Sequence, residues 1–200
     1  MSHYTPVPLV GNPSAVAEEA FLLWSLNNGI KTPLITWPTS SRGVGLRGVR
    51  AAKSLSPGDE LVRVPAALCL TIASAFADPI LGPPLRDEPA LVTMRGGIDV
   101  DAILAIQVLY HKLILGPASP FAPWMNILPD VDTLADWPIE ILFELQDNAL
   151  SETARRQAAT DGERCARIVN ALTARAPEIF TKEVFTTEWF LWALKIVGVY

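Results

Sequence analysis

Apolar residues recur at helical spacing along much of the chain, and this pattern predicts a largely helical protein. The first helix is expected to begin at Asn12-Pro13, a helix cap followed by a proline suited to the first turn, and to end at Gly29. One face of it carries Ala17, Ala20, Phe21 and Trp24. Further helices are expected over Thr71–Ala77, from Asp99 or Asp101 to Leu115, from Ser151 to about Ala174, and over Glu188–Val197.

The two longest of these helices differ in polarity. The helix ending at Leu115 has a broad apolar stripe. It also carries His111, which has no second metal-binding side chain four residues further on. His111 is therefore expected to be packed or to face solvent and not to bind a metal. The stripe consists of Val100, Ile103, Leu104, Val108, Leu109 and Leu113. The helix from Ser151 carries several charged side chains, which are expected to form a solvent-exposed face. These are Arg155, Arg156, Glu163, Arg164 and Arg167.

Strand patterns are concentrated before residue 66. A short strand is expected at Leu34-Ile35-Thr36-Trp37, before Pro38. The stretch Gly43–Pro65 then opens with glycines at 43, 45 and 48 and continues as an apolar–polar alternation. A turn at Ser56–Asp59 and a second strand at Glu60–Val64 complete an expected hairpin.

Glycines that precede a strand let a backbone approach a ligand closely, because no Cβ stands in the way. A hairpin with a glycine-rich entrance is nevertheless more often only a hairpin. The stretch lacks the Lys-Ser/Thr step of phosphate-binding P-loops, and its glycines open a strand rather than the helix of a dinucleotide-binding motif. A ligand-binding loop therefore needs further support.

Composition narrows the function classes. The 200 residues suffice for one large domain or two small ones, half of them are hydrophobic, and the net charge is −5. This balance implies no general affinity for nucleic acid or for an anionic membrane. The longest apolar runs are interrupted by polar residues before they reach the length of a membrane-spanning helix.

The N-terminus has no basic residue before Lys31, which argues against a secretory signal and an organelle transit peptide. Cys69 and Cys165 lack metal-binding spacing and are expected to be buried, reduced thiols. Cytosol or nucleus is the expected location. A chloroplast location stays open if the natural protein begins upstream of this sequence.

The hairpin stretch resembles the start of a SET domain, and the closest group is that of the Rubisco large-subunit methyltransferase and its non-histone lysine methyltransferase relatives. The resemblance lies in the order of short steps along the chain. These are Arg47-Gly48-Val49-Arg50-Ala51, Ser54-Leu55, Gly58-Asp59-Glu60-Leu61-Val62 and Val64-Pro65.

Three other segments resemble the same group. Phe21 and Trp24, followed by Gly29, are similar to its opening helix. Ser119–Pro129 is similar to its "S-x-F/W-x-P-Y" signature, with Trp124 at the usual tyrosine position, and Trp137-Pro138 with Glu144-Leu145-Gln146 continues the pattern. Phe190–Val197 resembles the helix that precedes the catalytic half of these enzymes.

The resemblance implies an α+β fold, namely the N-terminal half of a SET domain with short β-hairpins and a mainly α-helical insert. Its segments would be a flexible tail (1–12), an N-terminal SET segment (13–95), a helical insert (96–180) and the start of a truncated C-terminal SET segment (181–200). The implied activity is methylation of a lysine side chain in a protein substrate by S-adenosyl-L-methionine. Backbone contacts to that cofactor are implied for Arg47, Gly48 and Val49, whereas Gly45 stands where a variant of the family has a glutamate.

The catalytic residues of this family are an Asn-His motif and a later tyrosine, both C-terminal to the Phe190 helix. The chain contains no Asn-His dipeptide, and its tyrosines, Tyr4, Tyr110 and Tyr200, stand outside the required context. No catalytic and no metal-binding residue is therefore assigned. The chain is expected to be a truncated form that is inactive alone.

Two alternatives stay open. The chain could be a non-catalytic protein-binding module derived from a SET protein, in which the helical insert and the aromatic corner Phe121–Trp124 form the contact surface. It could also be an unrelated, mostly helical domain whose hairpin mimics that of a SET domain. Binding of the cofactor separates the methyltransferase from both.

Self-association is the first testable expectation. In the SET fold the C-terminal segment threads through a loop formed by earlier parts, and a chain without it would expose apolar surface and open strand edges that invite pairing. The mean hydropathy of +0.29 agrees with this. Size-exclusion chromatography is expected to show oligomers or poor recovery, and a monomer that melts cooperatively would contradict the expectation.

Overall fold

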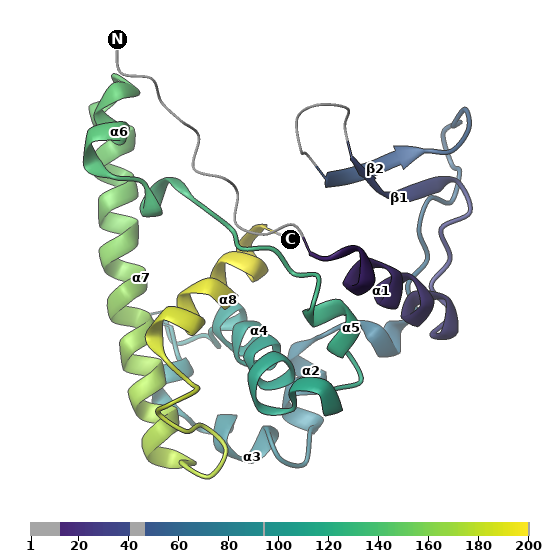
Figure 1. The fold of residues 1–200 in the computed structure, drawn as a ribbon. Helices are drawn as coiled ribbons and strands as arrows, with labels where there is room; N and C mark the ends of the chain where they lie inside the picture. Colours follow the sequence, from purple (N-terminus) through teal and green to yellow (C-terminus); the bar gives the residue numbers. More distant parts are fainter. Residues whose placement is uncertain (1–12, 41–46, 94, 200) are drawn as a thin grey trace.

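The computed structural model describes residues 13–40, 47–93 and 95–199. Within these ranges the chain has helices and a single two-stranded antiparallel sheet, which confirms the expected mixture of α and β structure. Figure 1 shows the sheet at one end of the molecule, next to α1, and the longest helix, α7, at the other. The helices are α1 (Ala15–Asn27), α2 (Ile72–Ala77), α3 (Gly82–Leu85), α4 (Val100–Leu109), α5 (Ala122–Met125), α6 (Ile139–Glu144), α7 (Asn148–Arg175) and α8 (Thr187–Val199).

The core is built around α4. Asp99 caps this helix by accepting a hydrogen bond from the backbone N–H of Ala102 at 3.1 Å, and the chain continues into a π-helical turn, Tyr110–Ile114, that ends before Gly116 at φ +50°. Solvent does not reach Ala102, Ile103, Ala105, Ile106 and Leu109. Of the expected stripe, Ile103, Val108 and Leu109 are buried, and Leu104 and Leu113 are partly buried. Val100 lies in the first turn and is 44% exposed, and burial extends beyond the stripe to the other faces of the helix.

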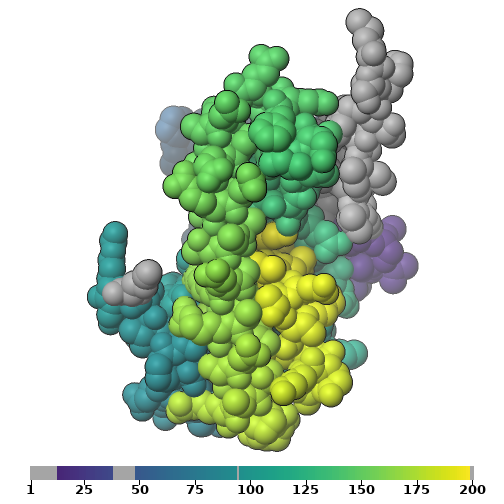
Figure 2. Space-filling model, turned by 90° about the vertical axis from the view of Figure 1, so that its left-hand side faces the viewer, coloured from purple at the N-terminus to yellow at the C-terminus, as the bar shows by residue number. Residues whose placement is uncertain are grey.

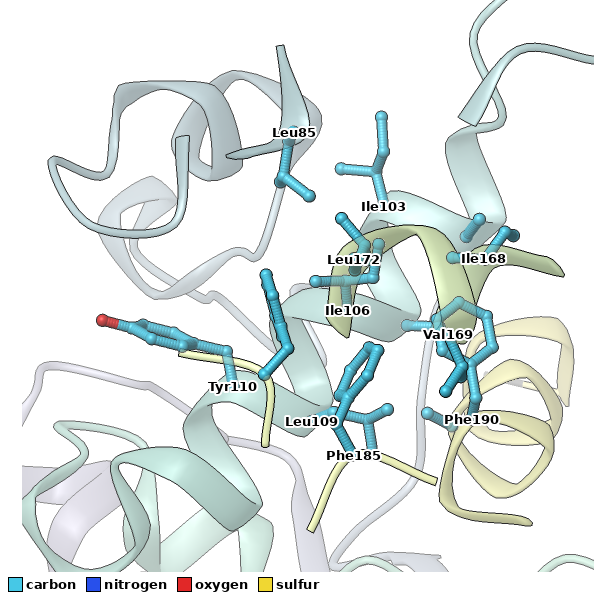
Figure 3. Close-up of a cluster of buried hydrophobic side chains, with 14 of the residues drawn as sticks. Leu85, Ile103, Ile106, Leu109, Tyr110, Ile168, Val169, Leu172, Phe185 and Phe190 are labelled. Carbon is cyan, nitrogen blue, oxygen red and sulfur yellow. The ribbon is translucent and has the colours of Figure 1, made fainter. Parts of the chain in front are cut away.

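Helices α7 and α8 cover α4. Figure 3 shows Ile103, Ile106 and Leu109 of α4 beside residues of both neighbours. The neighbours are Ile168, Val169 and Leu172 of α7, Phe190 of α8, and Phe185 in the segment before α8. Figure 2 shows α7 and α8 side by side on one face of the molecule. One hydrophobic cluster thus draws residues from the expected segments 13–95, 96–180 and 181–200.

The ends of α7 and α8 agree closely with the expectations. Helix α7 begins at Asn148, slightly before Ser151, because Asp147 accepts a hydrogen bond from the backbone N–H of Leu150 at 2.9 Å. In α8 the hydroxyl of Thr186 accepts from the backbone N–H of Trp189 at 3.3 Å. Both helices therefore begin at a residue type that favours the start of a helix.

The charges of α7 do not all form a solvated face, which corrects the expectation. Arg155 and Arg156 lie near Glu152 on the exposed side. Arg164, in contrast, forms a two-pronged ion pair with Asp99, whose side chain is only 8% exposed. Arg167 donates to the carbonyl oxygen of Ala90 at 3.0 Å. These two arginines attach α7 to the start of α4 and to the segment before it.

The sheet differs from the expected hairpin. Strand β2 (Arg47–Ala51) pairs with β1 (Ile35–Ser40), which continues through Pro38, and the register shifts between Thr36 and Thr39 around this proline. Residues 60–64 form no strand. Only Arg63 pairs, with Lys31, through backbone hydrogen bonds of 2.9 and 3.0 Å.

The turn at Ser56–Asp59 is confirmed, with Gly58 at φ +94°, but it does not fold residues 60–64 back onto β2. Residues 52–55 separate this turn from β2, so β2 pairs with the strand before it instead. Residues 61–64 are exposed on both sides, and they lack the buried face that fixes a strand in register. Gly43 and Gly45 lie outside the described residues.

Local signals place the first two helices. Helix α1 begins at Ala15 with Ser14 as its cap, not at Asn12, which lies outside the described residues, and Gly29 at φ +77° follows its end as expected. Helix α2 follows Thr71, which exchanges hydrogen bonds with Ser74 in a capping box, and this confirms the expected helix. No helix within the described ranges is long and apolar enough to cross a membrane.

Truncation of Ile106 tests the role of α4. Ile106→Ala removes three buried carbons from a site that solvent does not reach, and it is expected to lower the free energy of unfolding by about 2–5 kcal/mol. Urea unfolding followed by far-UV circular dichroism measures this loss. The matched control is Val100→Ala on the exposed first turn, which should change the free energy of unfolding by less than about 0.5 kcal/mol. Equal effects of the two substitutions would contradict the assignment of α4 to the core.

Candidate functional site

The cofactor contacts implied by the resemblance fall on strand β2. Arg47 pairs through its backbone with Ser40, and Gly48 pairs with Thr39. A Cβ built on Gly48 would meet no described atom within 4 Å, and the side chain of Val49 is 59% exposed. The structure therefore brings the three residues together on a strand that is open to solvent.

This strand alone does not enclose a cofactor. The two cavities described below are lined by other segments and include none of Arg47, Gly48 and Val49. An open glycine leaves room for a ligand against the backbone, but a site for a molecule as large as S-adenosylmethionine needs walls on several sides. Strand β2 would form only one such wall.

An aromatic cluster lies beside the hairpin and joins α1 and β1 to α5, which comes much later in the sequence. Its members are Phe21 and Trp24 of α1, Trp37 of β1, Phe121, and Trp124 of α5. Ring centroids are 5.2 Å apart for Phe21 and Trp37, and 6.3 Å apart for Trp24 and Phe121. These distances are in the range of favourable aromatic pairs, so the cluster connects the hairpin to α1 and to α5.

One hydrogen bond fixes this arrangement. The indole N–H of Trp24 donates to the carbonyl oxygen of Pro120 at 2.8 Å, across 96 residues of sequence. A cavity of about 220 Å³ adjoins the cluster and is lined by Phe21, Trp24 and Trp124 together with Ile30, Val64 and Leu68. The cavity has an almost entirely apolar lining, without a titratable side chain, and therefore offers no group for acid–base or nucleophilic chemistry.

His111 and Ser119 form a polar pair next to the cluster. The Nδ1 atom of His111 lies 3.1 Å from the hydroxyl oxygen of Ser119, which also accepts from the backbone N–H of Phe121 at 3.0 Å. The imidazole packs edge-on against Phe121 at 4.7 Å, and burial lowers its pKa despite an opposing effect of Asp78. Ser119 is buried and serves the turn before α5, so the pair orders this corner and is not a nucleophile with its base.

A lysine joins this corner to α8. Lys112 donates to the carbonyl oxygen of Met125 at 2.9 Å, and its ammonium group lies 5.0 Å from the centre of the Trp192 ring. Burial lowers its pKa, while Asp130 opposes this. This contact could not be predicted from the sequence, because a lysine in a helix is usually exposed. The aromatic signature Ser119–Pro129 did locate the corner itself.

The cysteines agree only in part with the expectation. Cys165 is buried in the core, and burial raises the pKa of its thiol to about 12. Cys69 is exposed, which corrects the expectation that both thiols are buried. It lies between the 3-10 turn Ala66–Leu68 and α2, and the residues on either side of it are not buried. Within the described part of the chain no three histidine, cysteine or acidic side chains are close enough to hold a metal ion.

No protein-family model matches the chain, and no curated protein matches it either.

The Trp24 hydrogen bond can be tested without loss of the ring. Trp24→Phe keeps an aromatic side chain but removes the N–H, and it is expected to lower the free energy of unfolding by about 1 kcal/mol because the carbonyl of Pro120 loses its donor. Equilibrium urea unfolding measures the difference. Trp189→Phe is the matched control, since the Trp189 indole has no hydrogen bond with any described residue. A loss as large for Trp189→Phe would count against this hydrogen bond.

His111 is expected to make stability depend on pH. Its pKa is lowered in the folded state, so the unfolded chain binds more protons below the ordinary histidine pKa of 6.5. The free energy of unfolding should therefore be constant above pH 7 and fall as the pH drops from 6.5 toward the folded-state pKa. His111→Gln should flatten this part of the curve in urea unfolding at pH 5.5 to 8, with His3→Gln as the control. An unchanged slope would show that another group is responsible.

Proposed function

We propose that this chain is the N-terminal part of a SET-domain protein-lysine methyltransferase of the Rubisco large-subunit methyltransferase-like group. In this proposal it contributes to the transfer of a methyl group from S-adenosylmethionine to a lysine of a non-histone protein. The net charge of −5 implies no general affinity for nucleic acid or an anionic membrane, which is compatible with a protein substrate.

One observation carries the proposal. Three segments that resemble the family at separate places in the sequence are neighbours in space: the Phe21–Trp24 pair, the Ser119–Pro129 signature, and the hairpin that bears Arg47–Val49. Phe21 contacts Trp37 of the hairpin, and Trp24 donates to Pro120 of the signature. Segments that resembled the family only by chance would not be expected to lie in contact with one another.

The residues present determine which part of the proposed site this chain would form. The backbone of Arg47, Gly48 and Val49 would form one wall of the cofactor site, and the exposed face of β2 leaves that wall accessible. The bound cofactor would supply the methyl group. A tyrosine hydroxyl and backbone carbonyls that polarise the reacting atoms would have to come from residues beyond these 200.

The test uses the full product of the natural transcript and S-adenosylmethionine labelled in its methyl group. Equilibrium dialysis is expected to show binding, and incubation with a cell lysate is expected to transfer label to lysine. Absence of both would overturn the proposal.

A matched pair of variants assigns the binding to β2. Gly48→Leu places a side chain over the backbone that would face the cofactor, and it is expected to abolish binding. Gly162→Leu, on an open face of α7, is the control, because neither added side chain would meet a described atom at its Cβ. Unchanged binding by Gly48→Leu would remove β2 from the site.

A further inference from the structure

A cavity of about 580 Å³ is lined mainly by α7 and α8, which lie away from the hairpin (Figure 1). Its volume is in the range of sites that hold a small ligand or a few side chains of a partner. Its walls include Leu150, Ala154, Ala158 and Asp161 of α7 with Leu191 and Leu194 of α8. Nothing in the resemblance assigns a role to it.

The cavity is elongated and changes character along its length. From Leu150 to Asp161 the wall follows α7 for eleven residues, which corresponds to about 16 Å. Leu150 and Ala154 make the α7 wall apolar toward one end, and the 3-10 turn Leu134–Asp136 adds Leu134 and Asp136 to the lining. The end at Asp161 is acidic, because Asp101 at the start of α4 also lines the cavity.

The positive charges at the cavity are already paired. Arg164 forms its ion pair with Asp99 and lies 4.0 Å from Asp161, and Lys195 is paired with Asp136. Two cationic side chains, Arg164 and Lys195, therefore face four carboxylates, those of Asp99, Asp101, Asp136 and Asp161. Asp101 has neither a hydrogen bond nor a short ion pair with any described side chain. An excess of negative charge therefore remains, and it favours a cationic group in the ligand.

Neutral hydrogen-bonding groups stand between the two ends. Thr153 and Gln157 both line the cavity from α7. The hydroxyl of Thr153 donates to the carbonyl of Ala149, so that its oxygen can still accept, and the amide nitrogen of Gln157 donates to Asp161 at 2.8 Å, which leaves the amide oxygen as an acceptor. Acceptors at this position suit the N–H groups of a peptide backbone.

We propose that this cavity binds a short extended peptide segment that carries an apolar side chain at one end and a lysine or arginine at the other. A length of about 16 Å corresponds to about five extended residues. The apolar residue lies at the Leu150 end and the basic residue lies between Asp101 and Asp161. This binding does not depend on methyl transfer, so it can hold or fail independently of the proposed function.

Fluorescein-labelled peptide pools test the proposal on the full chain. In the first pools leucine and lysine are separated by three randomised residues, in either order. In the control pools glutamate replaces lysine, or serine replaces leucine. Fluorescence anisotropy is expected to show saturable binding of the first pools, and binding at least about threefold weaker for each control. No saturable binding, equal binding of the glutamate pools, or equally tight binding of lysinamide alone would overturn the proposal.

Variants locate the binding. Asp101→Asn and Asp161→Asn are each expected to weaken binding of the lysine pools about threefold, because each removes one charge near the basic residue. Glu163→Gln is the control, since it removes a charge from α7 outside the cavity. Ala158→Phe fills the cavity and should abolish binding, with circular dichroism to show that the variant folds. If Ala158→Phe does not fold, the test rests on Asp101→Asn and Asp161→Asn. Binding of the lysine pools by these two variants that equals binding by Glu163→Gln would overturn the proposal.

Discussion

The burial of α4 is the constraint on which the rest of the molecule depends. Solvent does not reach five of its residues, and a helix with so much apolar surface must be covered on several sides. Helices α2, α7 and α8 provide the cover, with Phe180, Phe185 and Phe190 filling the space where the chain returns to α8. Asp99, the cap of α4, is buried although the two residues directly after it are exposed, and its carboxylate therefore needs a partner. Arg164 of α7 supplies it, so that the ion pair fixes how α7 crosses the helix.

The hairpin depends on a different contact. It contributes little to the main core, and it is held near the helices by the aromatic cluster and by the hydrogen bond from Trp24 to Pro120. The molecule therefore has a helical body that can be stable by burial alone, and a small sheet whose position relies on a few aromatic contacts. If the hairpin binds a cofactor, this corner is what places the binding strand relative to the helical body.

Much of the helical structure could be predicted from the sequence, because its signals are local. Thr71, Asp99 and Thr186 cap helices where the apolar periodicity begins, and Gly29 and Gly116 stand after helix ends. Strand pairing depends on residues far apart in the chain, and there the prediction was wrong. The alternation in residues 60–64 predicted a strand, but among the described residues only Lys31 forms a β-bridge with them.

The candidate site was predictable only as separate segments. The aromatic signature marked Ser119–Pro129, and the Phe21–Trp24 pair marked α1, but nothing in the sequence showed that the two meet. The roles of Arg164 and Lys112 were missed for the same reason, since a charge on a helix looks solvated until its partner across the fold is known. The cavity between α7 and α8 likewise arises from three segments that no single pattern connects.

The central claim is that these residues are one part of a SET-domain methyltransferase, and the most direct measurement is to sequence the natural transcript through the codon for Tyr200. The claim predicts that the reading frame continues into an Asn-His motif and then a tyrosine, the residues that would complete the site next to β2. A stop codon directly after Tyr200 would contradict it, and the function would then have to lie in what these 200 residues bind by themselves.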